Sequence, residues 1–180
     1  MTILHIDSSI TGDNSVSRQL TAATVNRLQS NRPDARVVHR DLVASPLSHL
    51  TLGGSSDEDV LEEFLAADTI VVGAPMYNFT IPSQLKAWVD RIAANGKTFR
   101  YTENGPEGLV GDKRVIVAVS RGGFYDTGHA FEHVESYMKA LFNFVGIEPE
   151  FVRADGVNIG PDQREQSIAG ALVYVESLAA

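Results

Sequence analysis

Apolar positions along the chain follow two periods, one typical of strands and one typical of helices. Short runs rich in β-branched and other apolar residues predict strands at 2–7, 35–41, 69–74, 113–120 and 150–154. Apolar residues at helical spacing predict helices at 16–29, 56–67, 83–94 and 162–178. A long amphipathic stretch after the fourth strand runs to Val145. Strands and helical stretches therefore alternate along the whole chain.

Two of these runs, 69–74 and 113–120, are apolar throughout and do not alternate with polar residues. A strand carries this pattern when helices cover both faces of a parallel sheet. We therefore expect an α/β fold, a three-layer sandwich around a five-stranded parallel sheet. Right-handed crossovers favour the strand order 2-1-3-4-5, which reverses direction between strands one and three.

Composition and charge narrow the possible functions. The chain has 180 residues, 43% of them hydrophobic, which suits a single domain covering 1–180. It has no cysteine, so redox chemistry would need an organic cofactor. Its net charge of −8 with scattered Lys and Arg disfavours nucleic acid as a partner. We expect a soluble, cytoplasmic protein that does not enter membranes, because no long apolar run or signal-peptide pattern is present.

The reversal of strand order requires binding residues in the loops after strands one, three and four. The first of these loops, "SSITGDNSVSR" at 8–18, is rich in hydroxyl groups and leads into a helix. Ser9, Ser15 and Ser17 can donate hydrogen bonds to an anion, and free N–H groups at the helix start add partial positive charge. The alternative is that Asn14 or Ser15 only caps the helix. No Walker loop or G-x-G-x-x-G pattern follows the first strand.

The second loop, "PMYNFTIPS" at 75–83, gathers aromatic residues between two prolines. The prolines fix φ at both ends, so we expect the backbone N–H groups between them to be free for a ligand. The side chains of Met76, Tyr77 and Phe79 offer flat or polarisable surface that suits a planar heteroaromatic ring. The alternative is a hydrophobic loop packed under a helix or in a dimer contact.

The third loop, "SRGGFYDTG" at 120–128, combines polar residues with two glycines. Gly122 and Gly123 allow a ring to approach the backbone closely, and Ser120 and Arg121 offer polar contacts. A Gly-Gly pair also occurs as a simple turn. Together, a phosphate cradle, an aromatic surface and a glycine-rich wall indicate a mononucleotide with a planar ring. Flavin mononucleotide (FMN) fits this combination best.

Several segments of the chain also match a known family. They are "SS" at 8–9, "SVS" at 15–17, "APMYNF" at 74–79, "TFRYTENGPEGLV" at 98–110, "SRGG" at 120–123 and "FVGI" at 144–147. On these segments the sequence resembles the FMN-dependent NADH:quinone oxidoreductases, also called NADH-azoreductases, which have a flavodoxin-like fold. The resemblance extends over nearly the whole chain, and its long middle segment is highly specific.

The resemblance implies cofactor-binding and substrate-binding residues. The residues implied to hold the FMN phosphate and its surroundings are Ser9, Ser15, Val16 and Ser17. Those implied to line the isoalloxazine ring are Met76, Tyr77, Asn78 and Phe79, with Ser120, Arg121, Gly122 and Gly123 on its opposite portion. The aromatic residues implied to lie near the substrate are Tyr101 and Phe144.

The resemblance also implies a homodimer with each flavin pocket at or near the subunit interface. The insertion "FRYTENGPEGL" before the fourth strand would then reach the partner subunit, whereas the alternative is a surface hairpin of a monomer. One departure from the family is the segment "LVASPLSHLTLGGS" at 42–55, which is shorter than its counterpart. A shorter segment there predicts a more open pocket mouth.

The activity implied by the resemblance is the transfer of a hydride from NADH to FMN, followed by two-electron reduction of a quinone or an azo bond in the same pocket. One pocket that serves both substrates in turn predicts ping-pong kinetics. Because the cofactor performs the chemistry, we expect no catalytic acid, base or nucleophile from the protein. An electron carrier of flavodoxin type and a non-enzymatic regulatory subunit are the alternative functions on this fold.

The five histidines raise the question of a metal. His129 and His133 are spaced i,i+4, and this spacing can bind a metal on a helix. No third ligand of similar quality lies near them in the sequence. We therefore expect no metal site at these residues.

Overall fold

The computed structural model describes residues 1–52, 58–126 and 128–179. The central sheet contains β1 (Thr2–Asp7), β2 (Arg36–Asp41), β3 (Thr69–Pro75), β6 (Arg114–Ser120) and β7 (Glu150–Ala154). A separate hairpin contains β4 (Phe99–Thr102) and β5 (Gly105–Gly108). The helices are α1 (Val16–Asn31), α2 (Glu58–Ala66), α3 (Ser83–Ile92), α4 (Glu135–Val145) and α5 (Pro161–Ser177), with a short 3-10 helix η1 (Gly12–Asn14) before α1. The predicted start of the second helix, at 56, lies outside the described residues.

All neighbouring strands of the central sheet are parallel, in the order β2-β1-β3-β6-β7. The five-stranded parallel sheet predicted from the sequence is confirmed. The order as stated, 2-1-3-4-5, needs correction because the sequence analysis counted no strands in the insertion at 98–110. That insertion forms β4 and β5, so the last two strands of the sheet are the sixth and seventh of the chain. The order still reverses direction between β1 and β3, as expected.

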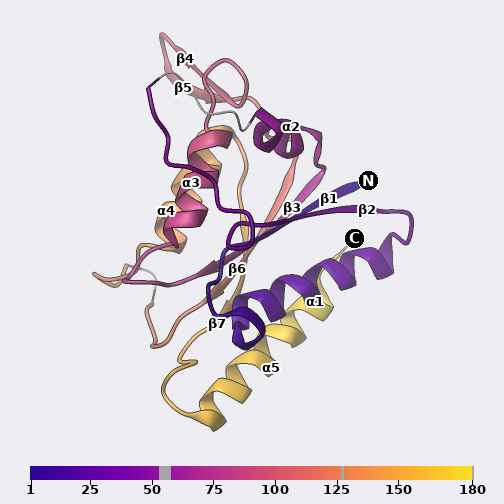
Figure 1. Ribbon diagram of the computed structural model, residues 1–180, viewed down its shortest axis with the longest axis vertical. Coiled ribbons are helices and arrows are strands. Elements are labelled where there is room, and N and C mark those ends of the chain that lie inside the picture. The colour runs from indigo at the N-terminus through magenta and orange to yellow at the C-terminus, as the bar shows by residue number, and fades with distance from the viewer. Residues whose placement is uncertain (53–57, 127, 180) are drawn as a thin grey trace.

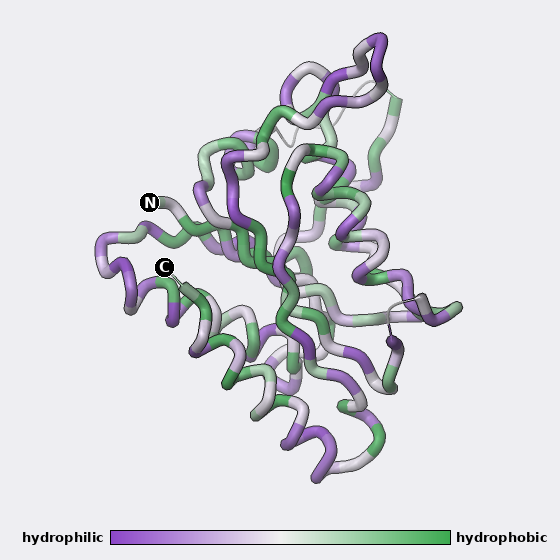
Figure 2. The backbone as a smooth tube through the Cα atoms, turned by 180° about the vertical axis from the view of Figure 1, so that it is seen from behind, coloured by the Kyte–Doolittle hydropathy of each residue, from purple (hydrophilic) through white to green (hydrophobic). Residues whose placement is uncertain are grey.

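Helices cover both faces of the sheet, as the fully apolar strands require. Figure 1 shows α1 and α5 side by side on one face and α2, α3 and α4 on the other. Separate clusters of buried apolar side chains fill the two faces, and β3 is buried along its whole length. The backbone coloured by hydropathy shows hydrophobic residues along the central strands (Figure 2). No helix in the described ranges is long and apolar enough to cross a membrane.

Strand β2 forms one edge of the sheet, and its residues are exposed or only partly buried. Its side chains include Arg36, His39, Arg40 and Asp41. The Arg40 guanidinium donates to Glu63 of α2 at 2.8 Å (Nε to Oε2) and to Asp59 at 2.6 Å (Nη2 to Oδ2). The edge strand is therefore attached to α2 by ion pairs.

Two glycines fix the β4–β5 hairpin on the end of α4. Gly146 follows α4 with φ 99°, a left-handed conformation that glycine adopts without steric cost. Gly108 of β5 lies directly against it, because a Cβ atom at Gly108 would be 2.2 Å from the Gly146 nitrogen. A side chain at Gly108 would therefore displace the hairpin from the helix.

A buried arginine joins the carboxyl ends of β6 and β7 to the start of α4. The Arg121 side chain is 2% exposed, and its guanidinium pairs with Asp155 at 2.9 Å, with Glu132 at 3.2 Å and also with Glu135. Burial lowers the pKa of Arg121, but these ion pairs raise it by more. Burial raises the pKa of the Glu135 carboxyl, and its hydrogen bonds to Arg153 and Arg121 outweigh this and lower the pKa.

We expect the substitution Arg121→Met to reduce the free energy of unfolding at pH 7 by about 3–5 kcal/mol, because it leaves buried carboxylates without their cation. The folded-state pKa values of Glu132 and Glu135 lie below the ordinary 4.5. The contribution of the network is therefore present above pH 4.5 and is lost as the pH falls through the lower folded-state values. Urea unfolding should show a difference between the two proteins that shrinks in acid.

Arg100→Met is the matched control for this substitution, since Arg100 pairs with Glu107 on the exposed hairpin. Its unfolding should resemble that of the wild type at every pH. Equal stability of the Arg121→Met variant and the wild type at pH 7 would contradict a structural role for the buried network.

Candidate cofactor site

A cavity of about 520 Å³ lies beyond the carboxyl ends of β1, β3 and β6. This is the edge at which parallel strands place ligands. The lining residues come from all three loops that the sequence analysis selected. The predicted cofactor-binding residues that line it are Ser9, Ser15, Val16, Met76, Tyr77, Ser120 and Gly122.

One end of the cavity is formed by the start of α1. Ser15 is the N-cap of this helix, and its Oγ accepts a hydrogen bond from the Arg18 N–H at 3.2 Å. Ser15 Oγ also lies 3.1 Å from Ser17 Oγ. Within the described residues the N–H groups of Val16 and Ser17 have no acceptor. These free donors and hydroxyl groups, at the positive end of a helix dipole, suit a phosphate.

Arg18 fixes the loop that carries Ser9. Its Nε and Nη2 donate to the Ser9 carbonyl at 3.1 and 2.9 Å. The same guanidinium makes a bidentate pair with the Asp41 carboxylate at 2.7 and 2.9 Å. This pair holds the pKa of the Asp41 carboxyl well below its usual range. Arg18 does not line the cavity but holds the loop of Ser9, which does. No pattern in the sequence pointed to this role.

The loop after β3 folds into a tight hairpin turn. Tyr77 and Thr80 exchange two backbone hydrogen bonds, of 2.9 and 3.1 Å. Between them, Asn78 and Phe79 have φ of 47° and 72°, as in a type I′ turn. Left-handed backbone at a phenylalanine costs about 1–3 kcal/mol, and such strain is concentrated at functional sites. The Phe79 ring, 44% exposed, stacks on the Phe131 ring with centroids 4.8 Å apart.

The turn leaves fewer free backbone donors than expected. Met76 N–H donates to the Ser120 carbonyl at 2.8 Å, and the N–H groups of Tyr77 and Thr80 bind each other's carbonyl oxygens. The expectation of free N–H groups throughout the loop was therefore wrong for these residues, because the chain folds back on itself. Within the described residues, the Asn78 and Phe79 N–H groups at the tip have no acceptor.

Tyr77 joins the first and second loops and separates two spaces. Its hydroxyl lies 3.0 Å from Ser9 Oγ and accepts from the Ile10 N–H at 3.2 Å. A second cavity, of about 850 Å³, shares Met76 and Tyr77 with the first and extends along Asn78 to Tyr137. Both volumes fall within the range of small-molecule sites. The smaller cavity, with groups that suit a phosphate, thus adjoins a larger cavity beside the aromatic turn.

Some of the predicted cofactor residues point elsewhere. The Arg121 guanidinium is engaged by three carboxylates, and its backbone N–H donates to the Ala154 carbonyl. Gly123 accepts a hydrogen bond from the Gly156 N–H at 3.0 Å and does not line the 520 Å³ cavity. Ser17 and Phe79 also lie outside its lining. These four residues therefore lie around the cavity and not in its lining.

The two predicted substrate residues both contact Phe99, away from the cavities. Tyr101 on β4 and Phe144 on α4 both contact the Phe99 ring, with centroids 5.6 and 4.4 Å apart respectively. Tyr101 is 70% exposed. Neither residue lines either of the two cavities. In one chain, therefore, the hairpin presents Tyr101 to the outside.

The loop after β7 and the first turn of α5 add lining residues that the sequence analysis missed. Val157, Asn158 and Arg164 face the 520 Å³ cavity, and Arg164 Nη2 donates to the Asn14 carbonyl at 2.8 Å. The sequence could have indicated them, because the loop after β7 leaves the same edge of the sheet as the loops after β1, β3 and β6. Only the loops after strands one, three and four were considered.

The structure also locates the histidines at 129 and 133 and part of the segment 42–55. His129 and His133 precede α4, which begins at Glu135, so their i,i+4 spacing does not place them on one helix face. The described part of segment 42–55, which ends at Leu52, lines neither cavity. Residues 53–55 lie outside the described ranges.

The comparisons with known proteins agree with this geometry. Residues 1–178 match the family model described as "Flavodoxin-like fold". The chain is 53% identical over 201 aligned residues to an FMN-dependent NADH:quinone oxidoreductase 2 of Bradyrhizobium diazoefficiens, covering 100% of both chains. It is 56% identical over 192 residues to an FMN-dependent NADH:quinone oxidoreductase of Sinorhizobium fredii, covering 95% of this chain and 93% of the relative.

A solved structure extends the comparison. The azoreductase of Bacillus anthracis superposes with a TM-score of 0.88 at 29% sequence identity, covering 98% of this chain and 97% of that one. The alignments to the two bacterial relatives cover 100% and 95% of this chain. The chain therefore belongs to the family of FMN-dependent NADH:quinone oxidoreductases, which has a flavodoxin-like fold.

Proposed function

We propose that this protein is an FMN-dependent oxidoreductase that oxidises NADH and reduces quinones by two electrons, and that it also cleaves aromatic azo bonds. The observation that carries the proposal is the cavity at the carboxyl edge of the sheet, with free N–H groups at the start of α1. The names of the quinone oxidoreductase relatives and of the azoreductase neighbour support the substrate classes.

The residues present fit FMN at both ends of the site. Ser9, Ser15 and the N–H groups of Val16 and Ser17 would hold the phosphate. At Gly122 a Cβ atom would lie 2.8 Å from Asn158 Nδ2, so the absence of a side chain keeps this wall open. When bound there, FMN supplies two-electron redox chemistry that the side chains of a cysteine-free protein do not provide.

The aromatic turn orients the ring part of the cofactor. Tyr77 is fixed through Ser9 and Ile10, so its position depends on the phosphate-binding loop. The N–H groups of Asn78 and Phe79, which have no acceptor among the described residues, would be donors toward the ring of bound FMN. Met76, with its N–H held by Ser120, covers the boundary between the two cavities. In this proposal the described residues position the cofactor, and the reaction needs no acid, base or nucleophile from them.

A cytoplasmic homodimer is part of this proposal. Several large apolar side chains are exposed, among them Ile10 at 60%, Phe124 at 59% and Phe131 at 52%. Ile10 lines the 850 Å³ cavity and Phe131 stacks on Phe79 of the aromatic turn, and exposed apolar side chains beside a site favour association there. The outward-facing Tyr101 lies on a hairpin held rigidly by the Gly108 contact. We infer that Tyr101 of one subunit reaches the substrate space of the other.

The activity itself provides the first test. Purified protein loaded with FMN should oxidise NADH in the presence of a quinone, and turnover should vanish when FMN is removed and return when it is added. Initial rates at several fixed quinone concentrations should give parallel double-reciprocal lines, as one pocket used in turn requires. FMN binding without NADH oxidation would indicate an electron carrier. Failure to bind FMN would indicate a non-enzymatic subunit.

We expect Gly122→Val to raise the dissociation constant of FMN at least about tenfold, equivalent to about 1.4 kcal/mol. The added side chain must displace Asn158 or occupy the cavity itself. Fluorescence quenching of FMN on titration with protein measures the affinity. Gly170→Val is the control, because nothing lies within 4 Å of a Cβ atom at Gly170 on α5. Flavin held as tightly by Gly122→Val as by the wild type would place the cofactor elsewhere.

A substitution on the hairpin tests the dimeric site. Light scattering should give twice the mass of one chain. Tyr101→Ala should raise the KM for the quinone about two- to tenfold, the value of one aromatic contact, while flavin content stays unchanged. Tyr174→Ala, at a partly exposed position on α5, should leave the KM as it is. A monomeric protein whose KM does not respond to Tyr101→Ala would exclude a contribution from the partner.

A further inference from the structure

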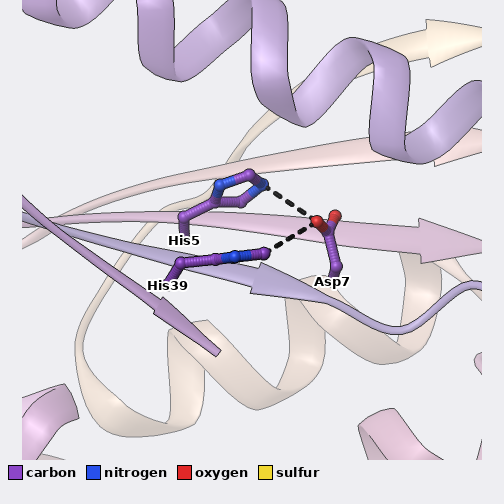
Figure 3. Close-up of side chains that lie close together, drawn as sticks. All are labelled: His5, Asp7 and His39. Atoms are coloured by element: carbon purple, nitrogen blue, oxygen red, sulfur yellow. Dashed lines mark hydrogen bonds and ion pairs between the residues drawn. The ribbon is translucent and has the colours of Figure 1, made fainter. Parts of the chain in front are cut away.

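Two histidines and an aspartate of the neighbouring strands β1 and β2 lie close together on one face of the sheet (Figure 3). His5 and Asp7 are two residues apart on β1 and so point to the same face. His39 on β2 lies opposite His5 in the parallel register. The two imidazole rings stack with centroids 4.4 Å apart. Both rings direct a nitrogen toward the same carboxylate.

The spacing of the nitrogen and oxygen atoms matches that of metal ligands. His5 Nε2 lies 3.3 Å and His39 Nε2 lies 3.0 Å from Asp7 Oδ2. The three ligand atoms all lie within 4.8 Å of one another. Ligands at about 2.0–2.1 Å from a tetrahedral Zn²⁺ are about 3.4 Å apart. Small side-chain movements would therefore bring the three atoms around one ion.

The burial of the cluster supplies an independent indication of a ligand. His5 Nε2 is buried without a hydrogen bond of acceptable geometry to any described residue, although it lies close to Asp7. A buried polar atom left in this way costs free energy unless it is satisfied by something else. His39, by contrast, has a side chain that is 47% exposed. It offers an ion a path from solvent to Asp7 and the largely buried side chain of His5.

The groups around the cluster are compatible with a cation. Thr21 Oγ1 donates to Asp7 Oδ1 at 2.8 Å, which orients the carboxylate and leaves Oδ2 toward the histidines, as outer-shell partners do in metal sites. Arg18 Nη1 approaches Asp7 Oδ2 to 3.6 Å. Its charge is already balanced by the bidentate pair with Asp41. The net charge left for the ion is that of the Asp7 carboxylate.

We propose that His5, Asp7 and His39 bind a divalent first-row transition metal ion, with Zn²⁺ as the ion that best suits two imidazoles, one carboxylate and an open fourth position. The ion would connect the edge strand β2 to β1 and satisfy the buried His5 nitrogen. The site is separate from the cofactor cavity, since none of its three residues lines that cavity. The proposal therefore does not depend on the proposed enzymatic function.

The test uses FMN-loaded protein without an affinity tag, titrated with zinc chloride alone in a chelator-free buffer. Isothermal calorimetry should show one Zn²⁺ per chain with micromolar affinity. At a hundredfold excess over the dissociation constant, Zn²⁺ should raise the melting temperature by about 5–10 °C. Zinc-edge X-ray absorption should show two imidazole ligands at about 2.0–2.1 Å.

His39→Ala is the decisive variant, because this half-exposed residue on an edge strand contributes little to the core. It should weaken Zn²⁺ binding at least about tenfold, with flavin content and circular dichroism as in the wild type. His49→Ala is the matched control, since His49 is exposed and outside the cluster, and it should bind Zn²⁺ as the wild type does. The proposal would be overturned if His39→Ala bound Zn²⁺ as tightly as the wild type does. It would also be overturned if the wild type bound no Zn²⁺ up to about 100 μM, or if its absorption spectrum showed fewer than two imidazole ligands.

Discussion

The parallel pairing of β1, β3 and β6 is the constraint on which the rest of the molecule depends. Parallel strands end at one edge of the sheet, so loops that are distant in the sequence meet there. They also require a covering layer on each face, and this determines the fully apolar strands and the amphipathic helices. The serine-rich start of α1, the aromatic turn and the glycine-rich loop come together because each follows one of these three strands.

Most of the fold could be predicted because it depends on local hydrophobic period. The strands and helices of the sandwich are recognisable from their apolar spacing alone. The β4–β5 hairpin was considered only as an alternative, because β5 consists of glycine, proline and glutamate, such as Gly105 and Pro106, and shows no apolar period. It is held by a backbone contact between Gly108 and Gly146, and no single-segment pattern reports such a contact.

The candidate site was predictable to a similar degree and for similar reasons. Hydroxyl, aromatic and glycine residues in the right loops identify the walls of the cavity. The direction of an individual side chain is decided by distant partners, so Arg121 turns toward Glu135 of α4 and Asp155, which follows β7. The contribution of Arg164 depends on how α5 crosses the start of α1. The pairing of His5 with His39 likewise becomes visible only when the strand register is known.

The composition of β2 has a consequence for the behaviour of the protein at high concentration. An open sheet edge presents unpaired N–H and C=O groups on which another chain can form a further strand, and this is the starting point of amyloid-like aggregation. The edge strand β2 is short, from Arg36 to Asp41, and its charged side chains oppose the approach of the same edge of a second molecule. Arg40 is in addition held across to α2. The charged residues of β2 thus protect this edge of the sheet against the addition of a strand from another chain.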